Sequence, residues 1–342
     1  MKVLVTGHRG YIGVEMVPVL RAAGHDVVGL DIGYFDGCDF RAPPDPVPSL
    51  DIDLRDVTPD HLRGFDAVVH LCALSNDPLG DLNPGVTYDI NLHASVGLAK
   101  AAKAAGVSRF LFSSSCSLYG AGGGGFLDEN AAFNPVTAYG ESKVRVEQEV
   151  STIADDSFCP AYLRNATAYG VSRRQRADIV VNNLVGHAIT TGKVMMQSDG
   201  SPWRPLVHIR DIIHAFEVML TAPRELIFNQ AFNVGRTSEN FQIRDVANMV
   251  AEVVPNCEVA FAAGASADAR DYRVDFGKIE RTLTAYKPTW TLRKGIEELY
   301  AAYRDAGLTK EEWLGPRYYR LRTIEGLKKS GAIDGELRRV KR

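Results

Sequence analysis

A tyrosine stands four residues before a lysine in the segment Tyr139-Gly140-Glu141-Ser142-Lys143, near the middle of the chain. On a helix, residues i and i+4 share one face, so the Lys143 ammonium would lie near the Tyr139 hydroxyl. A phenol is a weak base at neutral pH, but a nearby positive charge favours the phenolate and lowers its pKa. An oxidised nicotinamide would add a second positive charge. The spacing therefore predicts a proton acceptor for an alcohol that is being oxidised.

A glycine-rich turn near the N-terminus is suited to holding a nicotinamide cofactor. The segment Gly7-His8-Arg9-Gly10-Tyr11-Ile12-Gly13 joins a predicted strand to a predicted helix, whose N-terminal amides would face a pyrophosphate. Asp31 ends the second predicted strand, where its carboxylate would bind the adenosine ribose and repel a 2′-phosphate. The pattern therefore predicts NAD. Arg9 keeps NADP as an alternative, because a guanidinium in this turn would pair with a 2′-phosphate.

Short apolar runs alternate with helical patterns through the first half of the chain, which is typical of a doubly wound parallel sheet. The fold class is therefore predicted to be α/β, with a Rossmann sheet. The predicted strands are 2–6, 26–31, 50–53, 67–71, 110–113 and 161–164, and the predicted helices are 10–23, 83–105 and 137–154. The glycine-rich stretch 120–125 and the proline-rich stretch 32–49 are predicted to be loops.

After about residue 170 the alternation weakens, and a smaller lobe of mixed α/β structure is predicted. Helices are expected near 179–190, 211–220 and 243–253, and short strands near 204–208 and 231–234, with some of these pieces returning to the first core. The predicted domains are 1–170, which binds the dinucleotide, and 171–342, a substrate-binding lobe with a basic C-terminal tail. The tail has nine Lys/Arg against three Asp/Glu from 315 to 342 and is predicted to be a solvated terminal helix.

The composition argues against several classes of function. With 24% charged residues and a formal net charge of −3, the chain lacks the basic field of a nucleic-acid-binding protein. Its five cysteines are odd in number and form no C-x-x-C pair, so we expect neither disulfides nor a metal site. We see no signal peptide and no apolar run long enough to span a membrane. We therefore expect a cytoplasmic protein without a nucleic-acid or membrane partner.

Several motifs occur together in the order of one known family. The turn T-G-x-x-G-x-x-G, Asp31 and the Tyr-x-x-x-Lys pair are joined by Asp53-Leu54-Arg55-Asp56, His70-Leu71-Cys72-Ala73 and Ser113-Ser114-Ser115-Cys116-Ser117-Leu118-Tyr119-Gly120. With them the chain resembles the extended short-chain dehydrogenase/reductase family, the NAD-dependent nucleotide-sugar epimerases and dehydratases, over residues 1 to about 290. The resemblance implies these cofactor-binding residues: Gly7, Arg9, Gly10, Tyr11, Ile12, Gly13, Asp31, Asp53, Leu54, Leu71, Ala73, Tyr139 and Lys143.

The same resemblance implies a catalytic triad of Ser115, Tyr139 and Lys143. Tyr139 would take the proton of a sugar hydroxyl while Ser115 hydrogen-bonds the same oxygen, and hydride would pass to the nicotinamide. Lys143 would stabilise the phenolate and hydrogen-bond the nicotinamide ribose. His70 and His208 are predicted to be packed, hydrogen-bonded histidines, because the triad already supplies a base.

The two positions after Ser115 bear on the type of reaction. Similar 4,6-dehydratases and sugar-acid decarboxylases carry an acidic residue there, whereas this chain has Cys116 and Ser117. Neither side chain can act as a carboxylic acid, so dehydration and decarboxylation are disfavoured. In similar 3,5-epimerases a cysteine stands at the position of Ser117, so Cys116 is predicted to be a small buried residue.

The reaction that remains is epimerisation at carbon 4 through a transient keto sugar, with tightly held NAD. One alternative is an NAD(P)H-dependent reductase of a 4-keto sugar nucleotide, which shares the triad but releases its cofactor at each turnover. A second alternative is a non-catalytic dinucleotide sensor. Such sensors commonly lack the Tyr/Lys pair that this chain retains.

The substrate site is assigned from the resemblance. Arg204 and Arg270 resemble arginines that bind the nucleotide diphosphate, with Arg273 as the alternative to Arg270. Thr167 stands where the family commonly has an Asn. The predicted substrate-binding residues are Ser75, Ser117, Asn165, Thr167, Asn182, Arg204 and Arg270. In similar enzymes the helices over 91–105 and 137–154 form a two-fold interface, so we expect a homodimer that acts on a nucleotide-diphosphate sugar.

Overall fold

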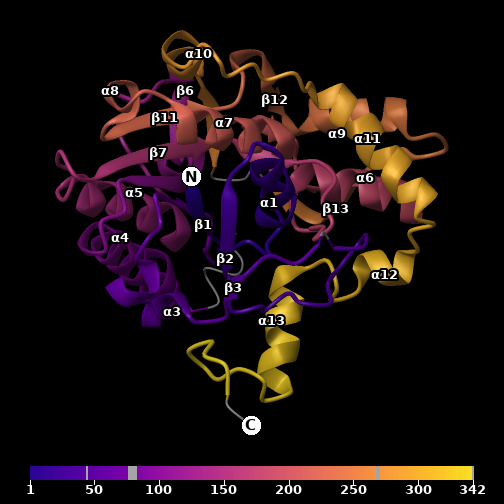
Figure 1. Ribbon diagram of the computed structural model, residues 1–342. Helices are drawn as coiled ribbons and strands as arrows, with labels where there is room; N and C mark the ends of the chain where they lie inside the picture. The colour runs from indigo at the N-terminus through magenta and orange to yellow at the C-terminus, as the bar shows by residue number, and fades with distance from the viewer. Residues whose placement is uncertain (44, 76–82, 267–269, 341–342) are drawn as a thin grey trace.

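The computed structural model describes residues 1–43, 45–75, 83–266 and 270–340. In this part of the chain the main element is a parallel sheet of seven strands in the order β11-β7-β5-β4-β1-β2-β3 (Figure 1). Its strands are β1 (Lys2–Thr6), β2 (Asp26–Leu30), β3 (Ser49–Leu50), β4 (Ala67–His70), β5 (Arg109–Ser115), β7 (Cys159–Asn165) and β11 (Gln230–Val234). The order reverses beside β1, and ligands of open α/β sheets bind at the carboxyl ends of the strands at such a point. The predicted Rossmann sheet is confirmed.

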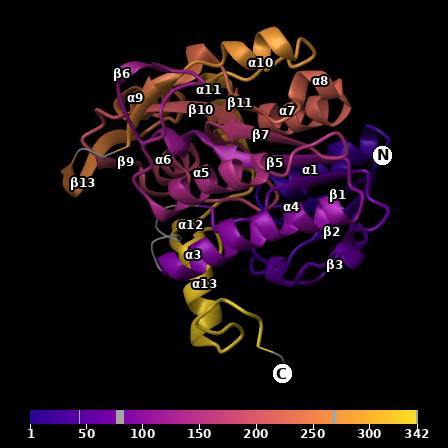
Figure 2. The same cartoon turned by 90° about the vertical axis from the view of Figure 1, so that its left-hand side faces the viewer.

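Helices cover both faces of this sheet because successive side chains of each strand point to opposite faces. Val3 and Val5 pack with α1 (Gly13–Ala22) and α7 (Ile209–Thr221), whereas Leu4 packs with the helices of the other face. Those helices are α4 (Ala94–Ala104) and α5 (Ala138–Ser151), which lie next to each other in Figure 2. The predicted helix over 83–105 is interrupted, because α3 (Pro84–Tyr88) runs into a π-helical turn before α4 begins.

A second, smaller core forms around α6 (Val180–Thr191), α9 (Ile243–Val253) and α11 (Leu292–Asp305). Its sheets are small: β10 pairs in parallel with β8 and antiparallel with β12, and β9 pairs with β13. The bounds of these and the remaining elements are β8 (Thr167–Tyr169), β9 (Lys193–Ser198), β10 (Trp203–His208), β12 (Asn240–Gln242), β13 (Glu258–Ser266), α8 (Arg224–Ile227), α10 (Gly277–Thr282) and α12 (Lys310–Leu314). The mixed C-terminal lobe is therefore present.

Two elements predicted in the second half of the chain pack with the first core. α7 packs on the main sheet, and β11 forms its edge beside β7. The division of the chain at residue 170 stays a prediction. The expected strand over 50–53 is shorter than predicted, because β3 ends at Leu50.

The prediction of a loop over 120–125 is wrong. Ala121–Leu127 forms strand β6, which pairs in parallel with β14 (Asp271–Val274). Glycine weakens a strand because it has no side chain to pack, but its backbone can still pair. The partner strand comes from a distant part of the sequence, so the local composition gives no sign of it.

The basic C-terminal tail is packed rather than simply solvated. It forms α13 (Arg320–Lys329), in which Arg320 and Ile324 are buried. Figure 1 shows α13 in yellow below the main body of the molecule. Among the described residues, no helix is both long and apolar enough to cross a membrane.

A buried ion pair attaches α5 to the sheet. Arg164 on β7 donates from Nε and Nη2 to the Glu147 carboxylate on α5 at 2.7–3.1 Å. Ser114 Oγ donates to the same carboxylate at 2.5 Å. The two charged side chains are only 5% and 6% exposed. Removing one of them would leave the other charge buried without a partner.

Replacement of Glu147 with Ala is expected to lower the free energy of unfolding by about 3–5 kcal/mol, because Arg164 would stay buried and unpaired. Glu149→Ala, on the same helix, is the matched control, since its pair with Arg145 is solvent-exposed. That control is expected to cost less than about 0.5 kcal/mol. Urea denaturation followed by circular dichroism measures both values, and equally small losses would contradict the assigned role of the buried pair.

Candidate active site

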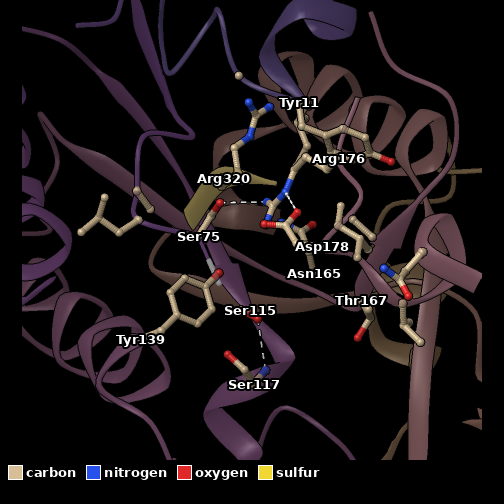
Figure 3. A pocket seen from close by; sticks show the side chains of 18 of the residues that line it. Tyr11, Ser75, Ser115, Ser117, Tyr139, Asn165, Thr167, Arg176, Asp178 and Arg320 are labelled. Carbon is tan, nitrogen blue, oxygen red and sulfur yellow. Dashed lines mark hydrogen bonds and ion pairs between the residues drawn. The ribbon is translucent and has the colours of Figure 1, made fainter. Parts of the chain in front are cut away.

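The predicted triad meets at the carboxyl end of the main sheet. Ser115 is the last residue of β5. The helix α5 begins nearby because Thr137 caps it, with Oγ1 accepting a hydrogen bond from Gly140 N at 3.2 Å. Tyr139 therefore falls in the first turn, and Lys143 follows one turn later on the same face. Figure 3 shows the Tyr139 hydroxyl directed toward the space beside Ser115.

Lys143 is held beneath the tyrosine ring. Its side chain is 3% exposed, and Nζ donates to Ser113 O on β5 at 2.7 Å. Nζ lies 5.4 Å from the ring centroid of Tyr139 and 4.5 Å from that of Phe112. Burial lowers the pKa of Lys143 to about 8. A positive charge at this position favours the Tyr139 phenolate, as the base chemistry requires.

One cavity of about 960 Å³ joins the cofactor end to the triad and to α6. The predicted site residues that line it are Gly7, Gly10, Tyr11, Ile12, Gly13, Asp31, Leu71, Ala73, Ser75, Ser115, Ser117, Tyr139, Lys143, Asn165, Thr167, Arg204 and Arg270. The other predicted site residues, Arg9, Asp53, Leu54 and Asn182, do not line it.

The glycine turn forms a narrow cradle. Gly7 has a φ of +72°, in the left-handed region that favours glycine. A Cβ on Gly13 would lie 2.3 Å from Gly7 O, so only glycine fits at that position. No side chain caps the N-terminus of α1, and its first residue, Gly13, lines the cavity. These features fit the pyrophosphate of a dinucleotide.

Asp31 lines the end of the cavity that is predicted to hold the adenosine, and Arg9 lies next to it. Asp31 accepts hydrogen bonds from Arg9 N at 3.1 Å and from Gly33 N at 2.8 Å. The Arg9 guanidinium instead pairs with Asp51 at 2.5 Å and Asp36 at 3.3 Å. A 2′-phosphate here would meet three carboxylates, while Arg9 is already engaged. The arrangement favours NAD over NADP.

Asp53 and Leu54 lie behind the cofactor end. Asp53 caps the short turn after β3, accepting from Arg55 N at 2.9 Å and from Arg55 Nη2 at 2.6 Å. Leu54 is buried in the core under the sheet. The short β3 and the tight turn after it direct both side chains into the protein. Their contact with an adenine stays a prediction.

Asn182 is fully buried and bonded to protein at both ends of its amide. Oδ1 accepts from Gly170 N at 3.0 Å, and Nδ2 donates to Arg176 O at 3.2 Å and to Tyr11 Oη at 3.3 Å. The side chain fastens the loop after β8 to the glycine turn. Its neighbour Asn183 lines the cavity instead. The sequence does not distinguish the two, because their exposure depends on where α6 begins.

The residues predicted to bind the substrate diphosphate lie along another wall of the cavity. Arg204 on β10 is buried, and its Nη1 donates to Trp203 O at 2.8 Å and also to Arg270 O. Asn165 also lines the cavity, with Nδ2 donating to Ser113 Oγ at 3.0 Å. The structure thus brings Arg204 and Arg270 together, although 66 residues separate them.

Sequence reasoning missed a charged pair in the cavity wall. Arg176 is buried, with Nε donating to Asp178 Oδ1 at 2.8 Å and Nη1 donating to Ser75 Oγ at 2.9 Å (Figure 3). The available signal was the charge-rich run Arg173-Arg174-Gln175-Arg176-Ala177-Asp178, which begins four residues after the end of β8 at Tyr169. Charged residues so dense beside a site-forming strand suggest a function beyond solubility.

Three residues with reactive side chains are packed away from the chemistry. Cys116 is buried, with Sγ donating to Arg164 O at 3.1 Å, and burial raises the pKa of its thiol well above the usual value. Burial lowers the pKa of His70 to about 3. His208 bonds Glu298 at 2.8 Å through Nε2. The predictions of a buried Cys116 and of packed histidines are confirmed.

Comparison with known proteins identifies similar enzymes. The UDP-glucose 4-epimerase of Corynebacterium glutamicum is 29% identical over 268 residues, which are 74% of this chain and 80% of that protein. The solved structure of MoeE5 in complex with UDP-glucuronic acid and NAD is 26% identical, with a TM-score of 0.78, covering 90% of this chain and 100% of that one. The dehydratase TunA, an NAD dependent-NDP-hexosamine 5,6-dehydratase, shares the fold at 21% identity and a TM-score of 0.79, over 89% of this chain and 98% of its own.

A family model identifies the family of the chain. The model of the NAD dependent epimerase/dehydratase family matches residues 3–235, which is more than half of the chain and includes the glycine turn, Ser115 and the Tyr139/Lys143 pair. The chain therefore belongs to the NAD dependent epimerase/dehydratase family, the extended short-chain dehydrogenase/reductase enzymes that its motifs resemble.

Proposed function

We propose that this enzyme inverts carbon 4 of a nucleotide-diphosphate sugar with bound NAD. The observation that carries the proposal is the set of groups at the triad. Tyr139, Ser115 and Lys143 border the cavity, whereas the two positions after Ser115 supply no carboxylate. Cys116 is turned into the core, and Ser117 offers only a hydroxyl. Such a site can remove and return a proton, but it lacks the extra acid that elimination of water requires.

Each member of the triad has a distinct task in this reaction. Tyr139 takes the proton of the 4-hydroxyl as the ketone forms and returns it when the alcohol is restored. Ser115 hydrogen-bonds the same oxygen, and the Lys143 ammonium favours the phenolate form of Tyr139. Bound NAD supplies the hydride acceptor for the first half of the cycle and the hydride donor for the second.

The carboxylates among the described lining residues are Asp31 and Asp178, and neither suits dehydration. Asp31 lies at the adenosine end of the cavity, beside the glycine turn. Asp178 is engaged in an ion pair of the cavity wall, with Oδ1 2.8 Å from Arg176 Nε. The cavity thus favours oxidation followed by reduction over loss of water.

A reductase that uses NADPH fits less well. It would have to place a 2′-phosphate near Asp31, Asp36 and Asp51, with Arg9 already paired to two of these carboxylates. The likeness to UDP-glucose 4-epimerase supports the epimerase and suggests a uridine nucleotide. We propose that Arg204 and Arg270 bind its diphosphate. The homodimer stays a prediction.

Tyr139→Phe is expected to slow the interconversion of UDP-glucose and UDP-galactose by about 10²–10⁴-fold, because it removes the proton acceptor. The variant should still release stoichiometric NAD when it is denatured, since the glycine turn and Asp31 would continue to hold the cofactor. Tyr88→Phe is the matched control, because it removes a tyrosine hydroxyl that donates to Glu141. Full activity in Tyr139→Phe, or an empty site that fills with NADPH, would contradict the proposal.

The pH dependence of kcat/KM tests the role of Lys143. Its pKa is lowered to about 8 by burial, so the ammonium loses its proton as the pH rises through about 8. Activity is therefore expected to fall on the alkaline side with an apparent pKa near 8. Lys143→Arg stays protonated and is expected to shift this fall upward by at least about one pH unit, at a lower maximum. An alkaline limb that does not move would argue against the role.

A further inference from the structure

The last described stretch of the chain, residues 316–340, packs over the cofactor end of the cavity; we call it the C-terminal strap. Within it, Ile324, Ile333 and Leu337 are buried in one apolar cluster. The cluster is completed by residues of other segments, which are Leu74, Val86, Ile90, Tyr34 and Phe35. Tyr34 and Phe35 belong to the loop after β2, and Leu74 to the loop after β4. The strap therefore spans two of the loops that border the dinucleotide crevice.

Polar contacts fasten the strap to the same side of the molecule. Arg338 Nη1 meets the two carboxylate oxygens of Asp56 at 2.9 and 3.0 Å. Arg339 Nη2 donates to Gly33 O at 2.6 Å, two residues after Asp31. The sequence suggested that Arg338 and Arg339 are solvated. In the structure they bond the loops after β3 and β2.

Arg320, at the start of α13, is buried and forms no ion pair among the described residues. Its side chain is 3% exposed and lines the cavity. Nη2 donates to Arg174 O at 3.1 Å, and the guanidinium carbon lies 3.9 Å from the ring centroid of Phe35. Nη1 has no hydrogen-bond partner among the described residues, and no carboxylate of this part of the chain forms an ion pair with Arg320.

A buried guanidinium without an ion pair is stabilised when an anion binds next to it. Burial and the repulsion of the nearby Arg176 lower the pKa of Arg320 to about 9, although the Asp178 carboxylate acts in the opposite direction. The group is therefore still charged at neutral pH. Leaving such a charge buried and unpaired costs several kcal/mol. Its counter-charge is expected to arrive with a ligand of the cavity.

The position of Arg320 indicates which ligand this is. Phe35, on which it stacks, follows Asp31 in the loop after β2. Figure 3 shows Arg320 reaching into the cavity beside Tyr11, which belongs to the glycine turn. Arg204 and Arg270, assigned to the substrate diphosphate, come from β10 and from the residue before β14. Arg320 is thus placed on the cofactor side.

We propose that Arg320 binds the pyrophosphate of NAD and that the C-terminal strap thereby retains the cofactor between turnovers. Backbone amides of the glycine turn would contact one side of the pyrophosphate, and the planar guanidinium would pair with its oxygens from the other. Retention suits an enzyme that must oxidise and reduce with the same dinucleotide. The inference rests on the cofactor of the family and not on which sugar is epimerised.

The full-length Arg320→Met variant tests the proposal without substrate. It is expected to lose bound NAD at least about tenfold faster than the wild type, which corresponds to about 1.4 kcal/mol or more. Nucleotide release on rapid gel filtration, followed by chromatography of the retained NAD, gives the rate. Lys329→Met, exposed on the same helix, is the matched control and should retain NAD as the wild type does.

Thermal melting separates binding from a structural role. Apo Arg320→Met is expected to melt at the same temperature as the apo wild type or higher, because it removes a buried unpaired charge. The rise in melting temperature on addition of saturating NAD should be smaller than in the wild type. A lower apo melting temperature with an unchanged rise would overturn the proposal, because it would indicate that Arg320 only stabilises the fold.

Wild-type retention of NAD in Arg320→Met would also overturn the proposal. If KM for the nucleotide sugar rose while NAD retention stayed normal, the guanidinium would belong to an anionic group of the substrate instead. Arg320→Gln, which stays polar, replaces the Met variant should that variant fail to fold, and the same loss of NAD is expected. Because NAD release is measured without turnover, its outcome is independent of the proposed epimerase reaction.

Discussion

The hydrogen bond from the buried Lys143 ammonium to Ser113 O is the contact on which the active site depends. It joins α5, which carries the proposed base Tyr139, to β5, which ends in Ser115. An ammonium is costly to bury, and this one persists because a carbonyl and two aromatic rings surround it. The same helical face continues to Glu147, which pairs with Arg164 in the core. Tyr139, Lys143 and Glu147 are four residues apart, so one helical stripe runs from the cavity to the centre of the molecule.

This stripe explains how the fold would support the proposed reaction, which needs little beyond proton and hydride transfer. The parallel sheet brings Ser115 and the glycine turn to the same edge, because the carboxyl ends of its strands meet there. The second lobe places Arg204 and Arg270 across the cavity, and the C-terminal strap covers the cofactor end. In the proposed mechanism the chemistry takes place at the edge of the sheet, and segments from later in the chain bind the substrate and the cofactor.

The sequence predicted the sheet, the glycine turn and the triad because each depends on local patterns. Alternating apolar residues determine β1, and the spacing of Tyr139 and Lys143 determines one helical face. Prediction from the sequence failed where contacts with residues far away in the chain determine the structure. Strand β6 forms from a glycine-rich stretch because β14 pairs with it. Asn182 turns from the cavity because Gly170 and Tyr11 bind its amide. The buried position of Arg320 likewise depends on contacts with loops near the other end of the chain.

The fate of the hydrogen at carbon 4 tests the central claim most directly. UDP-glucose deuterated at carbon 4 would be incubated with the purified enzyme without added cofactor, and the products analysed by nuclear magnetic resonance. The account predicts UDP-galactose with the deuterium still at carbon 4, because the hydride is taken up and returned within one bound NAD. Deuterium at carbon 6 of a 6-deoxy product, or in a nicotinamide cofactor released to solution, would contradict it.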